Sequence, residues 1–397
     1  MRHAVGDTPC VSVIIPLYNL RTFVGEAIES VLAQTLPRDQ VELIVVDDGS
    51  TDGGAEVVSR FAPRVRYLRR ENRGLSAARN VGIRASRAPF LAFLDADDRI
   101  LPEKLALQLE VFAARPEIGL VYTGVRYIDA TGKLLSQQGW SREEGAVLPR
   151  LVLGNLIHPH AALVRRGPVE RAGGFDESLT SVEDWDLWIR LAQAGVRWAC
   201  VDRPLAEYRI RPDAMHQNPA RMAENSVRVL DRVFGDPMLP PAVARLRPLA
   251  YQRVYLTAAC DHYRAGDPAE AARWLREAAA ARPAFLTEPR SLRQFCRSLL
   301  PLERRSEAAM AEDWWSLIQT LRLALASLFA ARDLELEIGR LRWRAELAYW
   351  RTAIRFARKN LWRRVKKAAS STVSAWRGSR SSSSARPAFS QSRSNDR

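Results

Sequence analysis

A short apolar run in the N-terminal half of the chain ends in a group of carboxylates. Phe90–Leu94 is apolar throughout, and the segment Asp95–Asp98 follows it with three aspartates. An apolar run this short is typical of a buried strand, and the carboxyl end of such a strand delivers side chains into a crevice of the sheet. Two carboxylates one residue apart at a strand end can share a hard divalent cation. The alternative is a cap for the helix-like stretch that begins at Leu101-Pro102, since Asp caps helices well.

Two further strand ends carry aromatic or acidic side chains. Tyr18 follows the β-branched run 11–16, and its ring can stack on a nucleobase. Asp48 follows the apolar run 41–46, and its carboxylate can accept a hydrogen bond from a pyrimidine N3–H. The alternative for Tyr18 and Asn19 is a turn that only ends the strand.

Charged side chains recur at two more places. Arg79 lies about one helical turn after Gly74. It can bind a diphosphate through two parallel hydrogen bonds, or it can pair with one of the aspartates. The acidic segment 183–186 precedes a helix-like stretch at 187–191 and suits a helix N-terminus, where negative charge is stabilised. An acid in that position can also act as a general base, so both interpretations stay open.

The elements that must position these side chains alternate between strands and helices from residue 10 to about 235. Residue patterns predict strands at 11–16, 41–46, 65–68 and 90–94, and helices at 23–32, 54–61 and 76–85. This alternation favours an open, mainly parallel α/β sheet flanked by helices. Ligands bind such sheets beyond the carboxyl ends of the strands, where the side chains named above are expected.

The chain continues with a helical, Ala/Leu/Arg-rich region over about 245–300. Within it, Tyr263–Leu275 resembles a helix–turn–helix pair of the tetratricopeptide type. One such unit cannot bury its apolar face alone, so we expect it to pack on the main domain. The stretch 314–331 is apolar but carries Arg322, and it is too short and interrupted for a membrane span.

The net charge of +15 comes almost entirely from the C-terminal segment. Residues 340–397 hold 16 Lys/Arg against 2 Asp/Glu, whereas residues 1–339 hold 44 Lys/Arg against 43 Asp/Glu. This distribution predicts an anionic partner for the C-terminal segment and indicates little about the main domain.

Cysteine usage favours a reducing compartment. The 4 cysteines are scattered without a CxxC pair, so they indicate neither a zinc site nor a disulfide framework. The residues before Asp7 lack the apolar stretch of a signal peptide. We therefore expect a cytoplasmic protein.

The basic segment 340–367 has an apolar stripe at helical spacing. Its aromatic and aliphatic members recur at steps of three and four residues: Trp343, Leu347, Trp350, Ile354, Ala357 and Leu361. A Trp- and Arg-rich amphipathic helix suits an anionic membrane interface, here the inner face of the cell membrane. The competing interpretations are a short coiled coil, although Arg340 and Arg364 fall on its seam, and nucleic-acid binding through charge alone. No module for specific nucleic-acid recognition is recognisable, and nothing indicates an oligomeric state.

Five segments occur together in one order, and their combination is more specific than any one of them. They are Val13–Asn19, Val46–Asp52, Gly74–Gly82, Leu94–Asp98 with its DxD motif, and Gly173–Glu177 leading into Val182–Trp188. Together they resemble the inverting nucleotide-sugar glycosyltransferases of family 2. The resemblance covers about residues 10–235. It implies a GT-A fold, in which a Rossmann-like nucleotide half and an acceptor half share one sheet.

For the donor side, the resemblance implies a site that binds a UDP-, dTDP- or GDP-linked sugar. Asp97 would be the direct ligand of a divalent ion, Mg²⁺ or Mn²⁺, and Asp95 would contact the ribose or help to hold the ion. Asp98 is expected only to cap the next helix. The residues implied in nucleotide-sugar binding are Pro16, Tyr18, Asn19, Asp48, Arg79, Asp95 and Asp97.

For the acceptor side, the resemblance places the general base at Asp184. A sugar hydroxyl is a poor nucleophile at neutral pH, so a base must take its proton as it attacks the anomeric carbon. Glu183, Trp185 and His160 are candidates for contacts with a saccharide or lipid-linked acceptor. His158 and His216 are weaker candidates, because packing or surface histidines are more common.

The implied activity is transfer of one sugar by a hexosyltransferase-type enzyme in the synthesis of cell-surface glycans or lipid-linked saccharides. The chain has no Gln-x-x-Arg-Trp segment after Asp184, which marks processive polysaccharide synthases, so single transfer is favoured over polymerisation. The alternatives are a nucleotidyltransferase, although 11–20 lacks a Gly-rich phosphate loop, or an inactive scaffold.

The predicted domains are an N-terminal extension (1–9), the GT-A domain (10–235), a helical region (236–335), a basic amphipathic helix (336–368) and a disordered Ser/Arg-rich tail (369–397).

Overall fold

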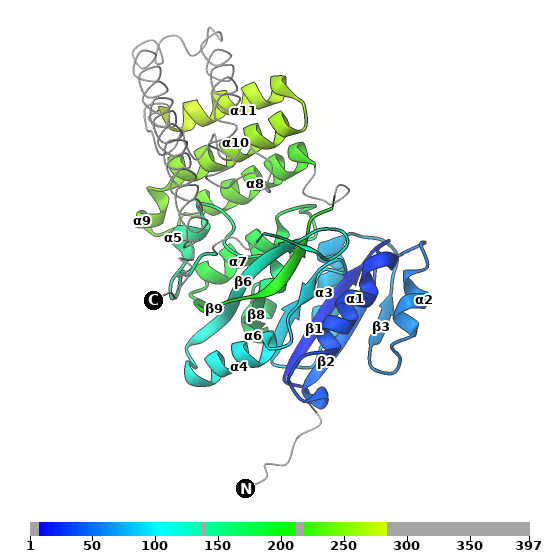
Figure 1. The fold of residues 1–397 in the computed structure, drawn as a ribbon. Coiled ribbons are helices and arrows are strands. Elements are labelled where there is room, and N and C mark those ends of the chain that lie inside the picture. Colours follow the sequence, from blue (N-terminus) through cyan, green and yellow to red (C-terminus); the bar gives the residue numbers. More distant parts are fainter. Residues whose placement is uncertain (1–7, 137–139, 212–217, 284–397) are drawn as a thin grey trace, which may run out of the picture. The chain divides into compact units, whose positions relative to one another are not determined.

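A mixed β-sheet forms the centre of the described part of the chain, for which we use a computed structural model (Figure 1). The structure describes residues 8–136, 140–211 and 218–283. In this part of the chain the sheet has 9 strands in the order β3-β2-β1-β4-β8-β6-β9-β5, with β7 paired to β6. The strands are β1 (Val11–Leu17), β2 (Val41–Asp47), β3 (Arg66–Arg69), β4 (Phe90–Phe93), β5 (Arg99–Ile100), β6 (Ile118–Ile128), β7 (Leu134–Ser136), β8 (Ala162–Arg165) and β9 (Arg197–Arg209).

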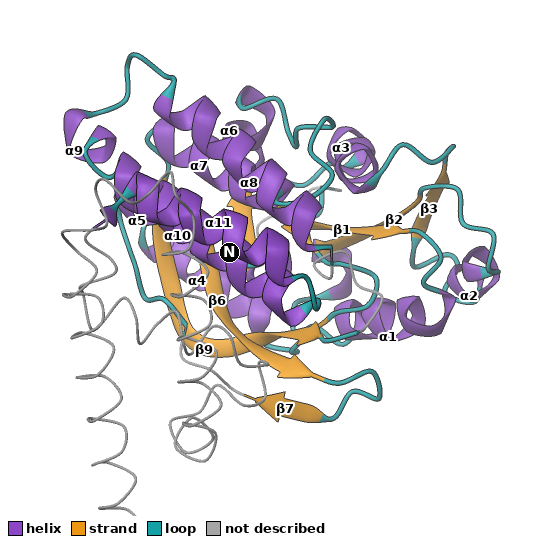
Figure 2. Ribbon diagram, turned by 90° about the horizontal axis from the view of Figure 1, so that it is seen from above, coloured by secondary structure: helices purple, strands orange, loops and turns teal. Residues whose placement is uncertain are grey.

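Helices cover both faces of this sheet, as Figure 2 shows from above. The helices α1, α2 and α4 lie on one face, and α3, α6 and α7 lie on the other. The helices are α1 (Arg21–Leu32), α2 (Gly54–Ser59), α3 (Leu75–Ala85), α4 (Lys104–Ala114), α5 (Leu148–Leu151), α6 (Arg166–Arg171), α7 (Glu183–Gln193), α8 (Pro219–Phe234), α9 (Pro241–Ala244), α10 (Arg247–Arg264) and α11 (Pro268–Ala281), with single 3₁₀ turns η1 (Arg38–Gln40) and η2 (Pro159–Ala161).

Strand β1 shows why these residues form a two-sided layer. Its side chains alternate between the faces, so that Val13 and Ile15 pack with α1, whereas Ile14 packs toward α3. At Gly82 of α3, an added Cβ would lie 2.3 Å from the Ile14 side chain. The glycine therefore allows α3 to approach β1 closely, which fixes the helix that carries Arg79.

The predicted strands and helices up to residue 94 are confirmed, each within a few residues. The first four strands in the sheet order, β3, β2, β1 and β4, are parallel. Beyond them the sheet is mixed: β8 runs antiparallel to β4 and β6, and β9 runs parallel to β6. The expected parallel sheet is therefore the N-terminal part of a larger mixed sheet.

The helical region packs on the α/β layers as expected. The pair α10–α11 is the predicted helix–turn–helix, with the Asp267 side chain accepting a hydrogen bond from the Glu270 N–H at the start of α11. Tyr251 of α10 donates a hydrogen bond of 2.6 Å to Asp231 of α8, and it belongs to the same core cluster as Trp188 of α7. Residues 236–283 thus share a compact unit with the sheet.

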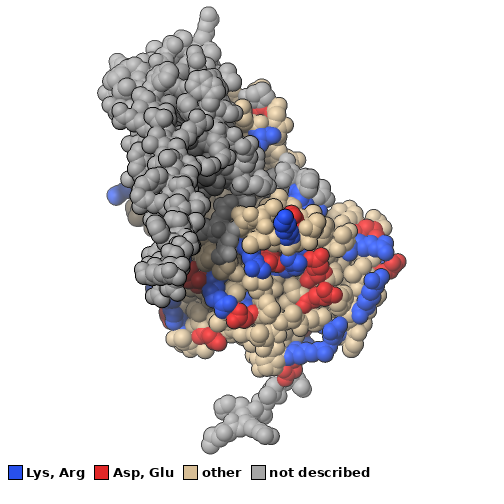
Figure 3. Space-filling model, viewed as in Figure 1, with Lys and Arg blue, Asp and Glu red and all other residues tan. Residues whose placement is uncertain are grey.

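Several predictions concern residues outside the described part of the chain: the extension up to residue 7, His216, the helical region beyond 283, the basic helix and the tail. Among the described helices, none has the length and apolar character needed to cross a membrane. On the face shown in Figure 3, basic and acidic side chains intermix over the described part. This matches the near balance of charges in residues 1–339.

Candidate active site

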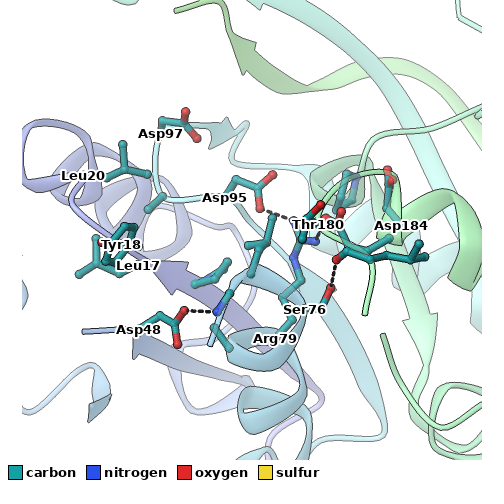
Figure 4. Close-up of a pocket in the computed structure, with 18 of the residues that line it drawn as sticks. Leu17, Tyr18, Leu20, Asp48, Ser76, Arg79, Asp95, Asp97, Thr180 and Asp184 are labelled. Atoms are coloured by element: carbon teal, nitrogen blue, oxygen red, sulfur yellow. Dashed lines mark hydrogen bonds and ion pairs between the residues drawn. The ribbon is translucent and has the colours of Figure 1, made fainter. Parts of the chain in front are cut away.

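A cavity of about 930 Å³ opens beyond the carboxyl ends of β1, β2 and β4, where ligands are expected to bind such sheets (Figure 4). Its walls come from segments that are far apart in the sequence. The lining includes Pro16–Leu20, Asp48, Asn72–Ser76, Arg79, Asp95–Asp98, Asn155, His158, Thr180, Val182–Asp184, Tyr208 and Arg211. Most of the predicted site residues therefore meet in one place.

The turns after β1 and β2 are hydrogen-bonded to each other. Asn19 has a positive φ of 50°, and its side-chain oxygen accepts a 2.9 Å hydrogen bond from the Thr51 N–H. Its own N–H donates to Ser50 Oγ at 3.1 Å. Asn19 therefore builds the predicted turn, and the turn leaves the neighbouring Tyr18 ring 49% exposed at the cavity. Pro16 lines the same wall from within β1.

Asp48 fixes the loop that leads into α3. Its carboxylate accepts hydrogen bonds from the N–H groups of Gly74 at 2.7 Å and Arg73 at 3.2 Å. Arg70 Nε forms an ion pair with the same carboxylate at 3.1 Å. Although buried, Asp48 reaches the cavity wall, and an ionised carboxylate has about four acceptor positions, so capacity remains for a ligand.

Arg79 connects the two carboxylate groups that the sequence singled out. Its terminal nitrogens lie 2.5 Å from Asp95 Oδ1 and 2.5 Å from Glu183 Oε1, and its side chain is only 1% exposed. The guanidinium also lies 5.1 Å from the centre of the Phe175 ring. Burial raises the pKa of Asp95, but the charge and the hydrogen bond of Arg79, together with the nearby imidazoles of His160 and His158, outweigh it and lower that pKa. The ion-pair alternative for Arg79 is thus confirmed.

The aspartates after β4 have separate partners. Asp97 accepts a 2.9 Å hydrogen bond from Arg211 Nε, and its pKa is raised to about 7 by burial and by the charges of Asp98 and Asp95. Asp98 is buried and accepts a hydrogen bond from the Arg209 N–H at 2.7 Å. Burial and Asp95 raise the pKa of Asp98 well above its usual value.

The helix-cap interpretation of these aspartates is wrong. Helix α4 begins at Lys104, and the residue before it, Glu103, makes no side-chain cap hydrogen bond. Between Asp98 and the helix lies β5, which pairs with β9 through Arg99 and Ile100. Asp98 is held by the Arg209 N–H at the end of β9, and Asp95 and Asp97 are held by Arg79 and Arg211, rather than by a helix terminus.

One arrangement of donor atoms suits a divalent cation. Asp95, Asp98 and His160 each offer one ligand atom, and these atoms all lie within 4.8 Å of one another. Two carboxylates with one imidazole suit Mn²⁺, and the carboxylates also suit Mg²⁺. The sequence predicted Asp97 beside Asp95 in this role, whereas Asp97 lies outside this group and is paired to Arg211.

His160 lies behind the cavity wall rather than on the acceptor side, which corrects the prediction. It is fully buried, and its Nδ1 lies 2.9 Å from Asp98 Oδ2. Burial lowers its pKa to about 4, so the ring is neutral at ordinary pH. The neighbouring His158 lines the cavity instead.

Asp184 lies in the first turn of α7 and faces the cavity. The residue before the helix, Val182, has a left-handed φ of 54°, an uncommon conformation for a β-branched residue. Asp184 accepts a hydrogen bond from Asn155 Nδ2 at 2.8 Å and another from the Trp185 N–H at 2.7 Å. Burial, followed by the charge of Glu183, raises its pKa to about 7, against the opposing effect of Arg79. Asp184 therefore accepts a hydrogen bond from a backbone N–H in the first turn of α7, and it can also exchange a proton near neutral pH.

Trp185 does not take part in the cavity, contrary to the prediction. Its indole N–H donates to the Leu151 carbonyl at 2.8 Å, and its ring lies in the core with Trp188. Asn155 and Arg211 are among the cavity residues that were not predicted. Asn155 has no sequence signal, because its role depends on a partner 29 residues away. Arg211 could have been suspected from its alternation with Arg209 near the end of β9, since side chains two apart share a face.

Comparison with known proteins agrees with this geometry. Residues 12–173 match the model of glycosyl transferase family 2. This stretch of the chain belongs to that family. An uncharacterized glycosyltransferase of Rickettsia bellii is 33% identical over 234 residues, which cover 58% of this chain and 33% of that protein. The chondroitin synthase of Escherichia coli is 31% identical over 194 residues, or 47% of this chain and 27% of the synthase. The chain spans only part of the curated relatives it matches.

Two solved structures share the fold of this chain. Residues 1–349 of S. aureus TarS in complex with UDP-GlcNAc give a TM-score of 0.55 at 17% identity, covering 84% of this chain and 92% of that one. The mannosyltransferase PcManGT from Pyrobaculum calidifontis, in complex with GDP-Man and Mn²⁺, gives 0.51 at 23% identity, covering 89% and 88%. The expected GT-A fold is confirmed.

Proposed function

We propose that this family 2 protein is an inverting glycosyltransferase that moves one hexose from a nucleotide diphosphate sugar to a hydroxyl acceptor. The observation that carries the proposal is one cavity with two carboxylate groups, Asp95–Asp98 and Asp184, joined through Arg79 and Glu183. Figure 4 shows Asp95 and Asp97 on one side of Arg79 and Asp184 on the other. In this proposal the first group serves the donor and the second serves the acceptor.

The donor binds along the turns after β1 and β2. The exposed Tyr18 ring stacks on the base, and Asp48 accepts a hydrogen bond from it, which suits uracil or thymine and also allows guanine. Pro16 and Asn19 shape this wall. That TarS and PcManGT were solved with UDP-GlcNAc and GDP-Man supports a nucleotide-sugar ligand for this fold.

Arg79 acts through its carboxylate partners in this proposal. Both terminal nitrogens are paired and the side chain is almost wholly buried, which leaves little surface for a diphosphate. Arg73 and Arg211 line the cavity and supply cationic side chains for the phosphates. Arg79 instead holds Asp95 and Glu183 in place through its two ion pairs.

The residues present fit a divalent cation, Mn²⁺ or Mg²⁺, at the end of β4. Asp95, Asp98 and His160 would hold it, with Asp97 joining if Arg211 releases its carboxylate. When bound, the ion acts as a Lewis acid that neutralises charge on the departing nucleoside diphosphate. Burial, followed by the negative charges of Asp98 and Asp95, raises the pKa of Asp97 to about 7, and a bound cation would relieve the repulsion between these carboxylates.

Asp184 is the general base of the proposed reaction. It takes the proton of the acceptor hydroxyl while the hydroxyl oxygen bonds to the anomeric carbon and the bond from that carbon to the diphosphate breaks. Attack from the face opposite the leaving group inverts the anomeric centre. A base with a pKa of about 7 is suited to this task at neutral pH, and Asn155 orients it.

A panel of nucleotide sugars tests this function against its alternatives. The protein is incubated with UDP-, dTDP- and GDP-sugars and Mn²⁺, and released nucleotides are quantified. Release of a nucleoside diphosphate that is lost in Asp97→Ala and after chelation supports sugar transfer. Pyrophosphate release would indicate a nucleotidyltransferase, and the absence of both products would indicate a scaffold.

The cellular setting is a separate part of the proposal. We propose a cytoplasmic enzyme that makes cell-surface glycan or lipid-linked saccharide and associates with an anionic membrane surface through 340–367, which lies outside the described residues. Flotation with anionic vesicles should lose binding when 340–397 is deleted. Unchanged flotation would contradict the membrane role.

A further inference from the structure

A second cavity of about 310 Å³ adjoins the first on the side of Asp184. The two share Asn155 and His158, which line both. This volume lies at the lower end of the range of small-molecule sites. The side cavity, as we call it, is lined by Thr123, Val125, Tyr127, Trp140, Ser141, Asn155, Leu156, Ile157 and His158.

Aromatic rings form a wall that runs from the main cavity into the side cavity. Tyr208 lines the main cavity, and its ring centre lies 4.7 Å from that of His158. Tyr127 lines the side cavity, with its ring centre 6.3 Å from that of His158 and 5.8 Å from that of Tyr208. The three rings come from β9, the loop before η2 and β6, so their grouping depends on the fold of the sheet.

Trp140 closes the side cavity against strand β6. An added Cβ at Gly124 would lie 2.3 Å from the indole ring, so the glycine allows the ring to lie directly on the strand. The register of β6 with β9 shifts on both sides of Gly124, which accommodates this contact. The indole N–H is buried and has no acceptor among the described residues.

The chemistry of the lining selects a neutral, amphipathic ligand. None of the described residues that line the side cavity is Lys, Arg, Asp or Glu, so a phosphate or carboxylate would find no ionic partner there. Aromatic faces match the apolar C–H face of a sugar ring, and Thr123, Ser141 and Asn155 can hydrogen-bond its hydroxyls. Asn155 links this site to the proposed base, because it also donates to Asp184.

We infer that the side cavity binds a sugar ring of the acceptor, so that the acceptor end presented to Asp184 is a saccharide. The inference rests on the proposed function and extends it from any hydroxyl compound to a glycan. The shared residues Asn155 and His158 mark the passage through which the reacting hydroxyl reaches the main cavity.

The test compares two ways in which a nucleotide sugar is consumed. With the donor identified by the panel, slow hydrolysis without acceptor uses the donor site alone, whereas transfer to p-nitrophenyl glycosides also uses the side cavity. Trp140→Ala should raise the KM for the glycoside about tenfold and leave hydrolysis unchanged. Gly124→Ala should act in the same direction by displacing the indole, and Trp140→Phe should retain most of the binding.

A binding measurement keeps the test independent of catalysis. Saturation-transfer NMR of the same glycosides, with UDP and Mn²⁺ present, should show ring protons in contact with the wild-type protein and weakened signals in Trp140→Ala. Leu134→Ala on β7, half-exposed and outside both cavities, is the control that should change nothing. Absence of binding to every glycoside, or an unchanged KM and NMR signal in Trp140→Ala, would overturn the inference. A protein that binds glycosides but consumes no nucleotide sugar would contradict the proposed function instead.

Discussion

The two sides of the main cavity are held together in different ways. On the β1–β2 side, polar side chains hold the turns by accepting hydrogen bonds from backbone N–H groups: Asn19 accepts from Thr51, and Asp48 accepts from Arg73 and Gly74. On the β8–β9 side, buried charges and stacked rings do so: Asp98 faces His160, and Tyr208 packs on His158. The first side relies on hydrogen bonds from side chains to the backbone of neighbouring turns, and the second on buried charges and stacked rings.

This difference indicates how each side responds to substitution. The exposed Tyr18 side chain on the β1–β2 wall can be removed with little effect on folding, because Asn19 and Asp48 hold the turns of that wall. On the opposite wall, removing one partner leaves a buried charge or polar group unpaired, which costs stability and shifts the pKa of its neighbours. Substitutions on the β1–β2 side should therefore change donor binding, whereas substitutions on the β8–β9 side should change stability.

The largest expected effect is at Arg79, which joins the sides. Replacing it by Met leaves Asp95 and the buried Glu183 without their shared cation, and we expect a loss of about 3–5 kcal/mol in the free energy of unfolding. Urea unfolding measures this, and Arg79→Lys, which keeps one charge, should recover part of it. A loss below about 1 kcal/mol would show that the two sides are held independently.

A second test concerns Lys104, which is fully buried and donates to Gln108 and to the Ala162 carbonyl. Burial lowers its pKa from 10.5 to about 7. Between these values the unfolded chain binds a proton that the folded protein does not, so stability falls as the pH drops from about 10.5 to about 7. Lys104→Met removes this penalty and loses about 1 kcal/mol of hydrogen bonding to Gln108.

The variant should therefore gain stability relative to the wild type as the pH decreases. Thermal unfolding at pH 9.5 and pH 6.5 measures both proteins. A difference in Tm that is the same at both pH values would mean that Lys104 is charged throughout, and the burial argument would be wrong.

A smaller effect is expected on the pH dependence of transfer. The rate should rise as the pH increases through about 7, because Asp184 must lose its proton to act as a base. Asn155→Ala removes a hydrogen bond that favours the ionised form of Asp184, so the pKa of Asp184 should rise. The rise in rate should then occur about one pH unit higher than in the wild type. Identical pH profiles for the two proteins would argue against Asp184 as the titrating group.

The smallest effect is expected at Tyr18 on the opposite side. Tyr18→Ala should weaken UDP binding about three- to tenfold through lost stacking, without a change in Tm, since the ring is 49% exposed. Calorimetric titration gives the Kd, and Tyr18→Phe should bind normally. Destabilisation of Tyr18→Ala would remove the contrast between the two sides.

The same contrast explains what the sequence could predict. The first four strands, the turn at Asn19 and the gathering of Asp48, Asp95 and Asp184 follow from local patterns and motif order. The pairing of Asp98 with His160 joins residues 62 positions apart, and β5, which separates Asp98 from α4, has only two residues. Trp185 was misplaced because its neighbour Asp184 faces the cavity while its own ring turns into the core. Such features depend on tertiary packing, for which the sequence has no local signal.

The measurement closest to the central claim compares Asp184→Asn with the wild type in transfer and in donor binding. Asp186→Asn is the matched control, because Asp186 lies on the same turn of α7, pairs with Arg190 and Arg232, and does not line the cavity. We predict that Asp184→Asn lowers kcat by about 10²–10⁴-fold with an unchanged Kd for UDP, whereas folded Asp186→Asn keeps its kcat. Transfer by Asp184→Asn at the wild-type rate would contradict the assignment of the general base.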